Sequence, residues 1–154
     1  MRLHVIAVGK RQPPWAEQAC GEYARRIRGD CSLQIRPVAA SRRSARDTAG
    51  RVREEGQALL SAVPGAALIV ALDVSGEGWS TEGLARRFEQ WRGNQRDVAF
   101  LIGGADGLAQ QCRDAARHCW SLSALTLPHA LARVVAVEQL YRAWSLVHGH
   151  PYHH

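Results

Sequence analysis

DVAFLIGGADG, residues 97–107, sets the fold class of this chain. An uninterrupted apolar run from Val98 to Ile102 is followed by three glycines within five residues. A short run of this kind predicts a strand buried on both faces, as in a parallel sheet covered by helices on both sides. Glycines at the strand end let the backbone take positive φ and approach a ligand without an intervening Cβ. The stretch therefore predicts an α/β sheet with a ligand site at its edge.

The rest of the chain alternates predicted strands and helices. Further strands are predicted at 3–8, 32–38, 66–73 and 120–127, and helices at 13–27, 45–62, 82–91, 109–119 and 129–149. Ser80 or Thr81 is predicted to cap the helix at 82–91, Asn94 to close it, and residues 74–80 to form a turn before it. Five or six strands with covering helices predict one three-layer, mainly parallel α/β domain over residues 1–154.

Composition places the chain among ordinary globular proteins, with 46% hydrophobic and 22% charged residues in 154. No apolar run approaches the roughly 18 residues of a membrane span, and residues 1–10 lack a secretory signal pattern. We therefore expect a cytoplasmic location and no membrane partner. The four cysteines show no CxxC spacing and are expected to be reduced thiols: Cys20, Cys31, Cys112 and Cys119.

Positive charge is concentrated in the front half of the chain. Residues 1–53 hold 12 Arg and Lys against four Asp and Glu, whereas the whole chain has a formal net charge of +6. Clustered arginines can neutralise several phosphates, which favours a polyanionic partner such as a nucleic acid. The alternative is that the arginines reflect a general bias in composition and lie on solvent-exposed helix faces without binding a partner.

Three strand ends are the expected places for a ligand, because ligands of open α/β sheets bind beyond the carboxyl ends of the strands. These are the loops after Leu72, Ile102 and Thr126. The glycine loop matches neither GxGxxG nor a P-loop, which disfavours a dinucleotide or a triphosphate. Its inner GxxG follows a strand, unlike the clamp of KH domains, and an ordinary strand-to-helix turn is an equal alternative.

The stretch SLSALTLPH, residues 121–129, adds hydroxyls beside the glycine loop. Pro128 favours an extended Leu127, so backbone NH and C=O groups are left free for a ligand such as a purine edge. The alternative is that Ser121, Ser123 and Thr126 bond their own backbone in a turn.

The final predicted helix, 129–149, is apolar on more than one face yet carries Arg133, Glu138 and Arg142. One domain covers only part of such a surface, so we expect a second subunit and a homodimer. Glu138 and Arg142 are four residues apart, and either pair with each other or contribute to a site. The histidine-rich end HGHPYHH, residues 148–154, is either a frayed tail or functional, and no metal is expected because no carboxylate or cysteine joins the histidines.

Four segments together resemble one known family: LHVIAVGK, DVAFLIGGADG, WSLSALTLPHALARVVAVEQLYRAWS and HPYHH. They occur in the order and spacing of the SPOUT-superfamily methyltransferases that modify a pseudouridine of 23S rRNA, from Met1 to the last residues. The resemblance implies homodimers, S-adenosylmethionine as cofactor and a C-terminal trefoil knot, which no rule of topology would have predicted. It also implies methyl transfer to N3 of the pseudouridine at position 1915, in helix 69, with assembled ribosomes as partner and no DNA.

Matched residue by residue, the resemblance assigns a cofactor site and a catalytic group. The cofactor residues would be Leu72, Gly103, Gly104, Gly107, Leu122, Ser123, Ala124, Leu125, Thr126 and Leu127. Tyr152 and His153 are the candidates for removing the N3 proton, in a tail that could act across the dimer. His129, Glu138 and Arg142 would hold the subunit seam, and Arg133 and Arg142 could instead contact phosphate.

The chain departs from the family pattern at three places. GGADG stands for the usual GGPEG, LPHALAR for LPHPLVR, and PYHH for PYHR or PYHK. At the last place a histidine, whose charge depends on pH, replaces a permanent cation, so activity is expected to be weaker or more sensitive to pH. Two rival functions are a noncatalytic ribosome or RNA-binding factor and an unrelated small-molecule α/β enzyme.

Overall fold

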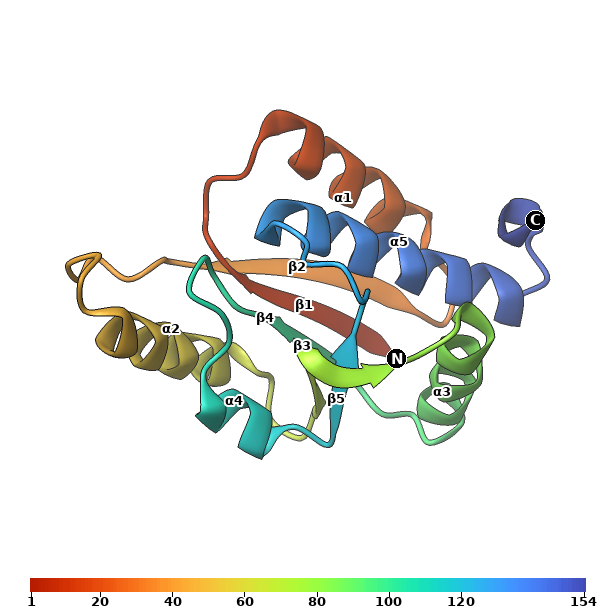
Figure 1. Ribbon diagram of the computed structural model, residues 1–154. Helices are drawn as coiled ribbons and strands as arrows, with labels where there is room; N and C mark the ends of the chain where they lie inside the picture. The colour runs from red at the N-terminus through yellow and green to blue at the C-terminus, as the bar shows by residue number, and fades with distance from the viewer.

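A computed structural model describes all residues from Met1 to His154 and contains one five-stranded sheet (Figure 1). The strand order is β2-β1-β4-β3-β5, and all neighbouring strands are parallel. The strands are β1 (Arg2–Val8), β2 (Ser32–Val38), β3 (Leu68–Gly78), β4 (Val98–Ile102) and β5 (His118–Ser121). The helices are α1 (Pro14–Arg26), α2 (Thr48–Ala62), α3 (Thr81–Gly93), α4 (Gln110–Ala115), α5 (His129–Val147) and the 3-10 helix η1 (Pro151–His153).

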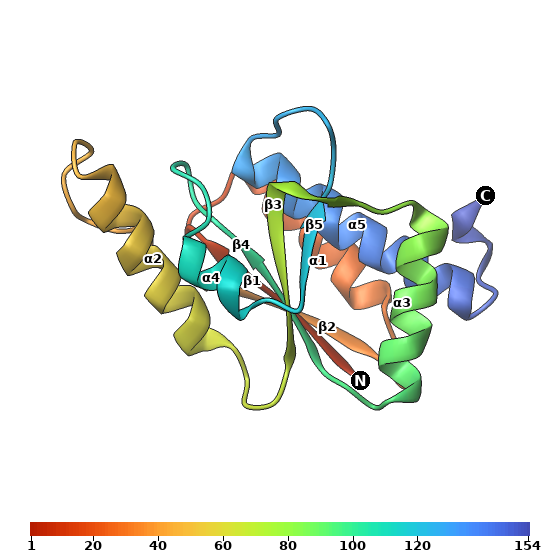
Figure 2. The same ribbon diagram turned by 60° about the horizontal axis from the view of Figure 1, so that its bottom comes forward.

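Helices cover both faces of the sheet, which confirms the predicted three-layer architecture. Figures 1 and 2 show α1 and α5 side by side on one face and α2 and α4 on the other, with α3 against the C-terminal part of α5. Alternate residues of β1 divide between two cores: Leu3 and Val5 face α1, α3 and α5, whereas Ile6 and Val8 face α2 and α4. None of the helices combines the length and apolar character that crossing a membrane requires.

The largest difference from the sequence prediction lies in β3, which continues through the expected turn at 74–78. After an irregularity between Leu72 and Glu77, β3 pairs again with β5, Glu77 opposite Trp120 and Gly78 opposite Ser121. The two backbones come very close here, because a Cβ on Gly76 would lie 2.6 Å from the carbonyl carbon of Cys119. The glycines that suggested a turn thus permit a close strand approach instead.

Three other predicted elements are shorter in the structure. The strand expected at 120–127 ends at Ser121, the helix expected at 109–119 covers only 110–115, and α2 begins at Thr48 instead of residue 45. Side-chain hydrogen bonds explain two of these ends: Asp47 caps α2 by accepting from the Gly50 NH at 3.0 Å, and Ser121 Oγ donates to the Ser123 carbonyl at 3.1 Å. Because the sheet is parallel, the carboxyl ends of β3, β4 and β5 still meet at one edge.

His4 lies inside the sheet and predicts how stability depends on pH. Its side chain is 2% exposed and neither ring nitrogen has a hydrogen-bond partner. Burial, helped by the nearby Arg36, lowers the pKa of His4 below its ordinary value. As pH falls, the unfolded chain therefore binds a proton at this position before the folded protein does, so stability is retained above about pH 6.5 and lost below it.

We expect His4→Leu to remove part of this pH dependence. Urea unfolding of the wild type between pH 7.5 and 5.5 should show a loss that approaches about 1.4 kcal/mol per pH unit from this one group. The variant should unfold with a shallower slope against pH, and equal slopes in the two proteins would contradict the assignment. His118→Leu is a second test of the same effect and should also make the slope against pH shallower, because burial lowers the pKa of His118 as well.

Candidate active site

A cavity of about 580 Å³ opens between the bend of β3 and the carboxyl ends of β4 and β5. The three segments selected from the sequence form its walls, although the one after Leu72 is a bend within β3 and not a loop. Nine of the ten predicted cofactor residues line it: Leu72, Gly103, Gly104, Gly107, Leu122, Ser123, Leu125, Thr126 and Leu127. Ala124 belongs to the same loop but is exposed to solvent and does not line the cavity.

The glycine loop forms a tight turn with its backbone towards the cavity. The Gly107 NH donates to the Gly104 carbonyl at 3.1 Å, and Gly107 has a φ of +92°. A Cβ on Gly103 would lie 2.5 Å from the Gly107 carbonyl oxygen, and one on Gly104 would lie 3.0 Å from Val8 Cγ1. Side chains are therefore excluded from the loop, and its peptide groups remain close to any ligand.

Charged pairs hold two walls of the cavity in place. Arg51 of α2 lies 3.0 Å from Asp106 of the glycine loop, and Arg113 of α4 lies 2.7 Å from Asp73 at the bend of β3. Burial acts to raise the pKa of Asp73, but hydrogen bonds from Ser75 and Arg113 outweigh it and hold this pKa below the usual value. The wall of the cavity thus contains a carboxylate that favours its charged form and is paired with Arg113.

Asp73 was missed in the sequence, although it directly follows Leu72 and the strand-end rule that selected Leu72 applies to it equally. Trp120 and Ala132 also line the cavity and were missed. The sequence gives a weaker signal for both, since Trp120 begins the strand predicted at 120–127 and Ala132 has no polar group.

The loop 122–128 is held by its own hydroxyls. Ser123 Oγ accepts a hydrogen bond from the Leu125 NH at 2.9 Å, and Ser123 O accepts from Ser121 Oγ. Ser121 and Ser123 therefore bond to the backbone of their own loop, which is the alternative to ligand binding that the sequence left open. The loop nevertheless lines the cavity.

A second group of polar residues lies where α5 meets the C-terminal segment. Glu138 and Arg142 form an ion pair of 2.6 Å, and the Tyr152 hydroxyl donates a hydrogen bond to Glu138 Oε1 at 3.2 Å. The Tyr23 hydroxyl of α1 lies 3.2 Å from that of Tyr152. Together Tyr23, Glu138, Arg142 and Tyr152 are called the tail cluster below.

Tyr152 is poorly suited to act as a base in this arrangement. Burial raises the pKa of its phenol, and the hydrogen bond to Tyr23 and the charge of Glu138 raise it further. The phenol therefore stays protonated near neutral pH and serves as a hydrogen-bond donor. The Arg142 guanidinium lies 5.0 Å from the centre of the Tyr152 ring, which ties the tail to α5.

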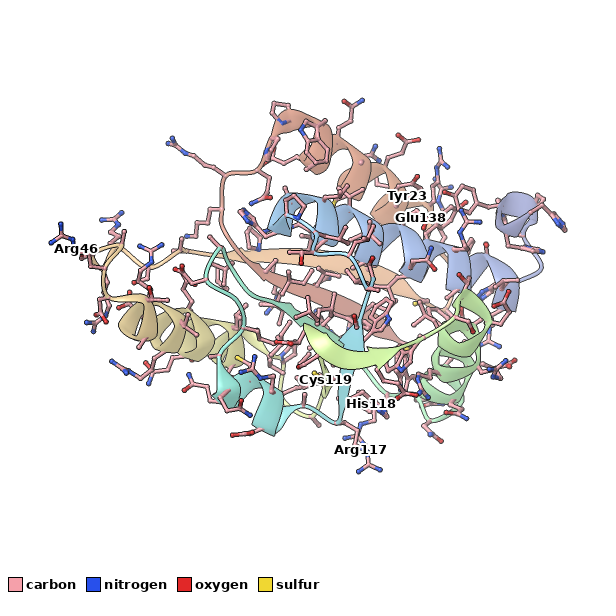
Figure 3. The ribbon with its side chains drawn as sticks, viewed as in Figure 1. Tyr23, Arg46, Arg117, His118, Cys119 and Glu138 are labelled. Atoms are coloured by element: carbon pink, nitrogen blue, oxygen red, sulfur yellow. The ribbon has the colours of Figure 1, made fainter.

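The predicted catalytic residues do not come together within one chain. His129 lines the cavity at the start of α5, whereas Glu138 lies nine residues further on, about 13 Å along the helix axis. Figure 3 shows Tyr23 and Glu138 close to each other, far from Arg46 at the opposite side of the molecule. His153 follows Tyr152 and contacts the His150 carbonyl. The three residues expected at the subunit seam, His129, Glu138 and Arg142, thus lie on one helix but not in one cluster within a chain.

The arrangement of possible metal ligands bears on the expectation that the chain binds no metal. No three His, Cys, Asp or Glu residues are grouped so that they could bind a metal ion. In the histidine-rich end, His148 is hydrogen-bonded to the Trp144 carbonyl and to Asp30, which anchors the end of α5 to the loop before β2.

Comparison with known proteins identifies the family. The family described as "Predicted SPOUT methyltransferase" matches residues 1–153. The chain belongs to this SPOUT methyltransferase family. Membership makes it a methyltransferase and implies the C-terminal trefoil knot. Members of the SPOUT methyltransferase family use S-adenosylmethionine.

Two curated relatives of the SPOUT methyltransferase family align over their full length. Proteins named "Ribosomal RNA large subunit methyltransferase H" from Thioalkalivibrio sulfidiphilus and Methylococcus capsulatus are 48% and 47% identical, each covering 99% of both chains. Among solved structures, a probable methyltransferase from Bordetella pertussis shares the fold with a TM-score of 0.56 and 19% identity, over 93% of this chain and 94% of that one. A putative methylase family protein from Neisseria gonorrhoeae gives a TM-score of 0.55 at 13% identity, over 90% and 81%.

The cavity fits the cofactor of the SPOUT methyltransferase family. Its volume lies in the usual range of about 300 to 1,000 Å³ for small-molecule sites. Leucine side chains supply apolar walls for an adenine ring, and the glycine loop leaves backbone groups uncovered. The residues present therefore suit S-adenosylmethionine.

Proposed function

We propose that this protein transfers a methyl group from S-adenosylmethionine to N3 of a pseudouridine in 23S rRNA, at position 1915 in helix 69. The observation that carries the proposal is the full-length identity of 48% to a protein named for methylation of large-subunit ribosomal RNA. The cavity between the bend of β3 and the ends of β4 and β5 supports it, because it suits the methyl donor. The predicted cofactor residues that line the cavity would hold the donor there.

Positioning is the main task of the protein in this reaction. When bound, S-adenosylmethionine supplies an electrophilic methyl group. The glycine loop and the loop 122–128 would hold it at the mouth of the cavity, beside His129. Holding the two reactants close together in the correct orientation accounts for most of the rate acceleration in a reaction of this kind. The N3 atom must also lose a proton, and His153 is the better candidate for accepting it, because the phenol of Tyr152 stays protonated.

RNA would approach the edge of the sheet where the cavity opens. The loops after β1 and β2 end at this same edge, since the strands are parallel. Lys10, Arg11, Arg42 and Arg46 lie in these loops, are exposed and form no ion pair within the chain. Free cations near the cavity favour contact with phosphates, whereas Arg43 and Arg51 are paired with acidic residues.

A homodimer would complete the active site. The exposed apolar side chains Val74 and Leu125 line the cavity, and exposed Leu131 follows on the first turn of α5. A second copy packed there would cover these residues and could bring its own tail cluster to the cavity. This arrangement explains how Glu138 and Tyr152 take part although they lie far from His129 within one chain. We further propose that residues 1–154 act as one domain in the cytoplasm.

Radioactive methyl transfer tests the proposal directly. Purified protein with labelled S-adenosylmethionine and ribosomes that lack the modification should place label on one pseudouridine of 23S rRNA, located by nuclease digestion and mass spectrometry. The rival RNA-binding factor would bind ribosomes with a steep salt dependence and transfer no label. An unrelated small-molecule enzyme would do neither.

A further inference from the structure

Arg133 of α5 is a buried cation without a counter-ion. Its side chain is 5% exposed and forms no ion pair. Its Nη2 donates to the carbonyls of Val8 at 3.1 Å and Gly9 at 3.2 Å, at the carboxyl end of β1. Its Nε is buried without a partner, and no protein atom accepts a hydrogen bond from Nη1. About three of the five N–H donors of this guanidinium are therefore unused.

No neighbouring group forms an ion pair with this charge, although the Glu17 carboxylate of α1 acts on it from a distance. Glu17 of α1 faces the same space but is exposed and forms no ion pair with Arg133. Cys20 is a buried thiol whose pKa is raised by burial, so it stays neutral. Lys10, the remaining charged neighbour, is a second cation. A buried charge that lacks a partner destabilises a protein unless something else pairs with it.

A separate cavity of about 200 Å³ adjoins the guanidinium. Lys10, Gln12, Glu17 and Arg133 supply its polar lining. The Gln12 amide Nε2 already donates to the carbonyls of Gly9 at 3.4 Å and Arg11 at 3.1 Å. Lys10 is exposed, so the cavity opens to solvent at its rim. It shares no lining residue with the 580 Å³ cavity, but it lies at the same edge of the sheet, beyond β1 and β2 instead of beside the bend of β3 and the ends of β4 and β5.

We infer that this second cavity binds a phosphate group through Arg133 and Lys10. A phosphate offers acceptor oxygens to the free donors of Arg133 and to the Lys10 ammonium. Its negative charge compensates the buried guanidinium. The source is a backbone phosphate of the RNA substrate, an assignment that rests on the proposed function, whereas the affinity for phosphate itself does not.

Inorganic phosphate is the probe for the test, with the full-length protein and no methyl-transfer assay. The melting temperature of the wild type should rise with phosphate concentration at constant ionic strength set with chloride, because a ligand that binds only the folded state stabilises it. Arg133→Gln, which keeps a donor for the β1 carbonyls but removes the charge, should weaken phosphate binding by about tenfold or more. Lys10→Met should weaken it less, and it serves as the test variant if Arg133→Gln does not fold.

Arg86→Gln is the matched control, because Arg86 is an exposed arginine of α3 without an ion pair and outside the cavity. It should respond to phosphate as the wild type does. Equal phosphate responses of the wild type, Arg133→Gln and Lys10→Met would overturn the inference.

Competition identifies the source of the phosphate. Phosphate should displace a single-stranded RNA oligonucleotide from the wild type but not from Arg133→Gln, and should leave the affinity for S-adenosylmethionine unchanged. If phosphate instead competes with S-adenosylmethionine, the cavity holds the carboxylate of the methyl donor and the assignment to RNA is wrong. Failure of methyl transfer to ribosomes would refute the proposed function while leaving the phosphate titration intact.

Discussion

Gly103→Ala is expected to lower the affinity for S-adenosylmethionine by about 10- to 100-fold, which corresponds to about 1–3 kcal/mol of overpacking expressed in binding. The added Cβ would lie 2.5 Å from the Gly107 carbonyl oxygen, 2.6 Å from the Gly107 carbonyl carbon and 2.8 Å from the Leu108 nitrogen. All three atoms belong to the backbone, so no rotamer change relieves the clash. The glycine loop must shift, and the cavity floor shifts with it. Calorimetric titration with S-adenosylmethionine measures the effect.

Gly65→Ala is the matched control for this prediction. Gly65 lies in the loop between α2 and β3, and a Cβ there would meet no atom within 4 Å. Its affinity for the methyl donor should equal that of the wild type. A folded Gly103→Ala protein that binds S-adenosylmethionine with unchanged affinity would show that the glycine loop is not part of the cofactor site.

The architecture was predictable because its main signals are local. The apolar runs of β3 and β4 are too continuous for strands with one wet face, so they predict a sheet with two covered faces. The extent of β3 was not predictable in the same way. Whether SGEG turns or continues as a strand depends on β5, where Cys119 approaches Gly76, and that contact joins segments far apart in the sequence.

The two parts of the candidate site also differ in whether a local sequence signal predicts them. The cavity loops could be located from the sequence because parallel strands place their carboxyl ends at one edge. The tail cluster required a contact between Tyr23 and Tyr152, which are 129 residues apart. No spacing in the sequence encodes that contact, so Tyr23 was missed. The sequence also does not reveal that Arg133 forms no ion pair, because this depends on the distances to acidic residues in the folded chain.

Tyr152→Phe is expected to slow methyl transfer by about 10- to 100-fold, which corresponds to the roughly 1.5–3 kcal/mol that a hydrogen bond to a charged group contributes. The Tyr152 hydroxyl links Tyr23 to Glu138, and without it the Glu138 carboxylate loses a donor and the tail loses its polar anchor. Affinity for S-adenosylmethionine should not change, because the residues that line the cavity include none of the tail cluster. Turnover at saturating methyl donor, measured beside calorimetry, separates the two effects.

Tyr141→Phe is the control, since Tyr141 packs 4.5 Å from the Tyr152 ring centre to ring centre, yet its hydroxyl makes no hydrogen bond within the chain. It should retain wild-type turnover. Co-expression of Tyr152→Phe with Gly103→Ala then tests whether the tail acts on the partner's cavity. Mixed dimers would pair an intact tail with an intact cavity at one of two sites, restoring roughly a quarter of wild-type activity if subunits associate at random. If mixing restores nothing while mixed dimers are present, each tail serves its own chain, and α5 must then rearrange to bring Glu138 to the cavity.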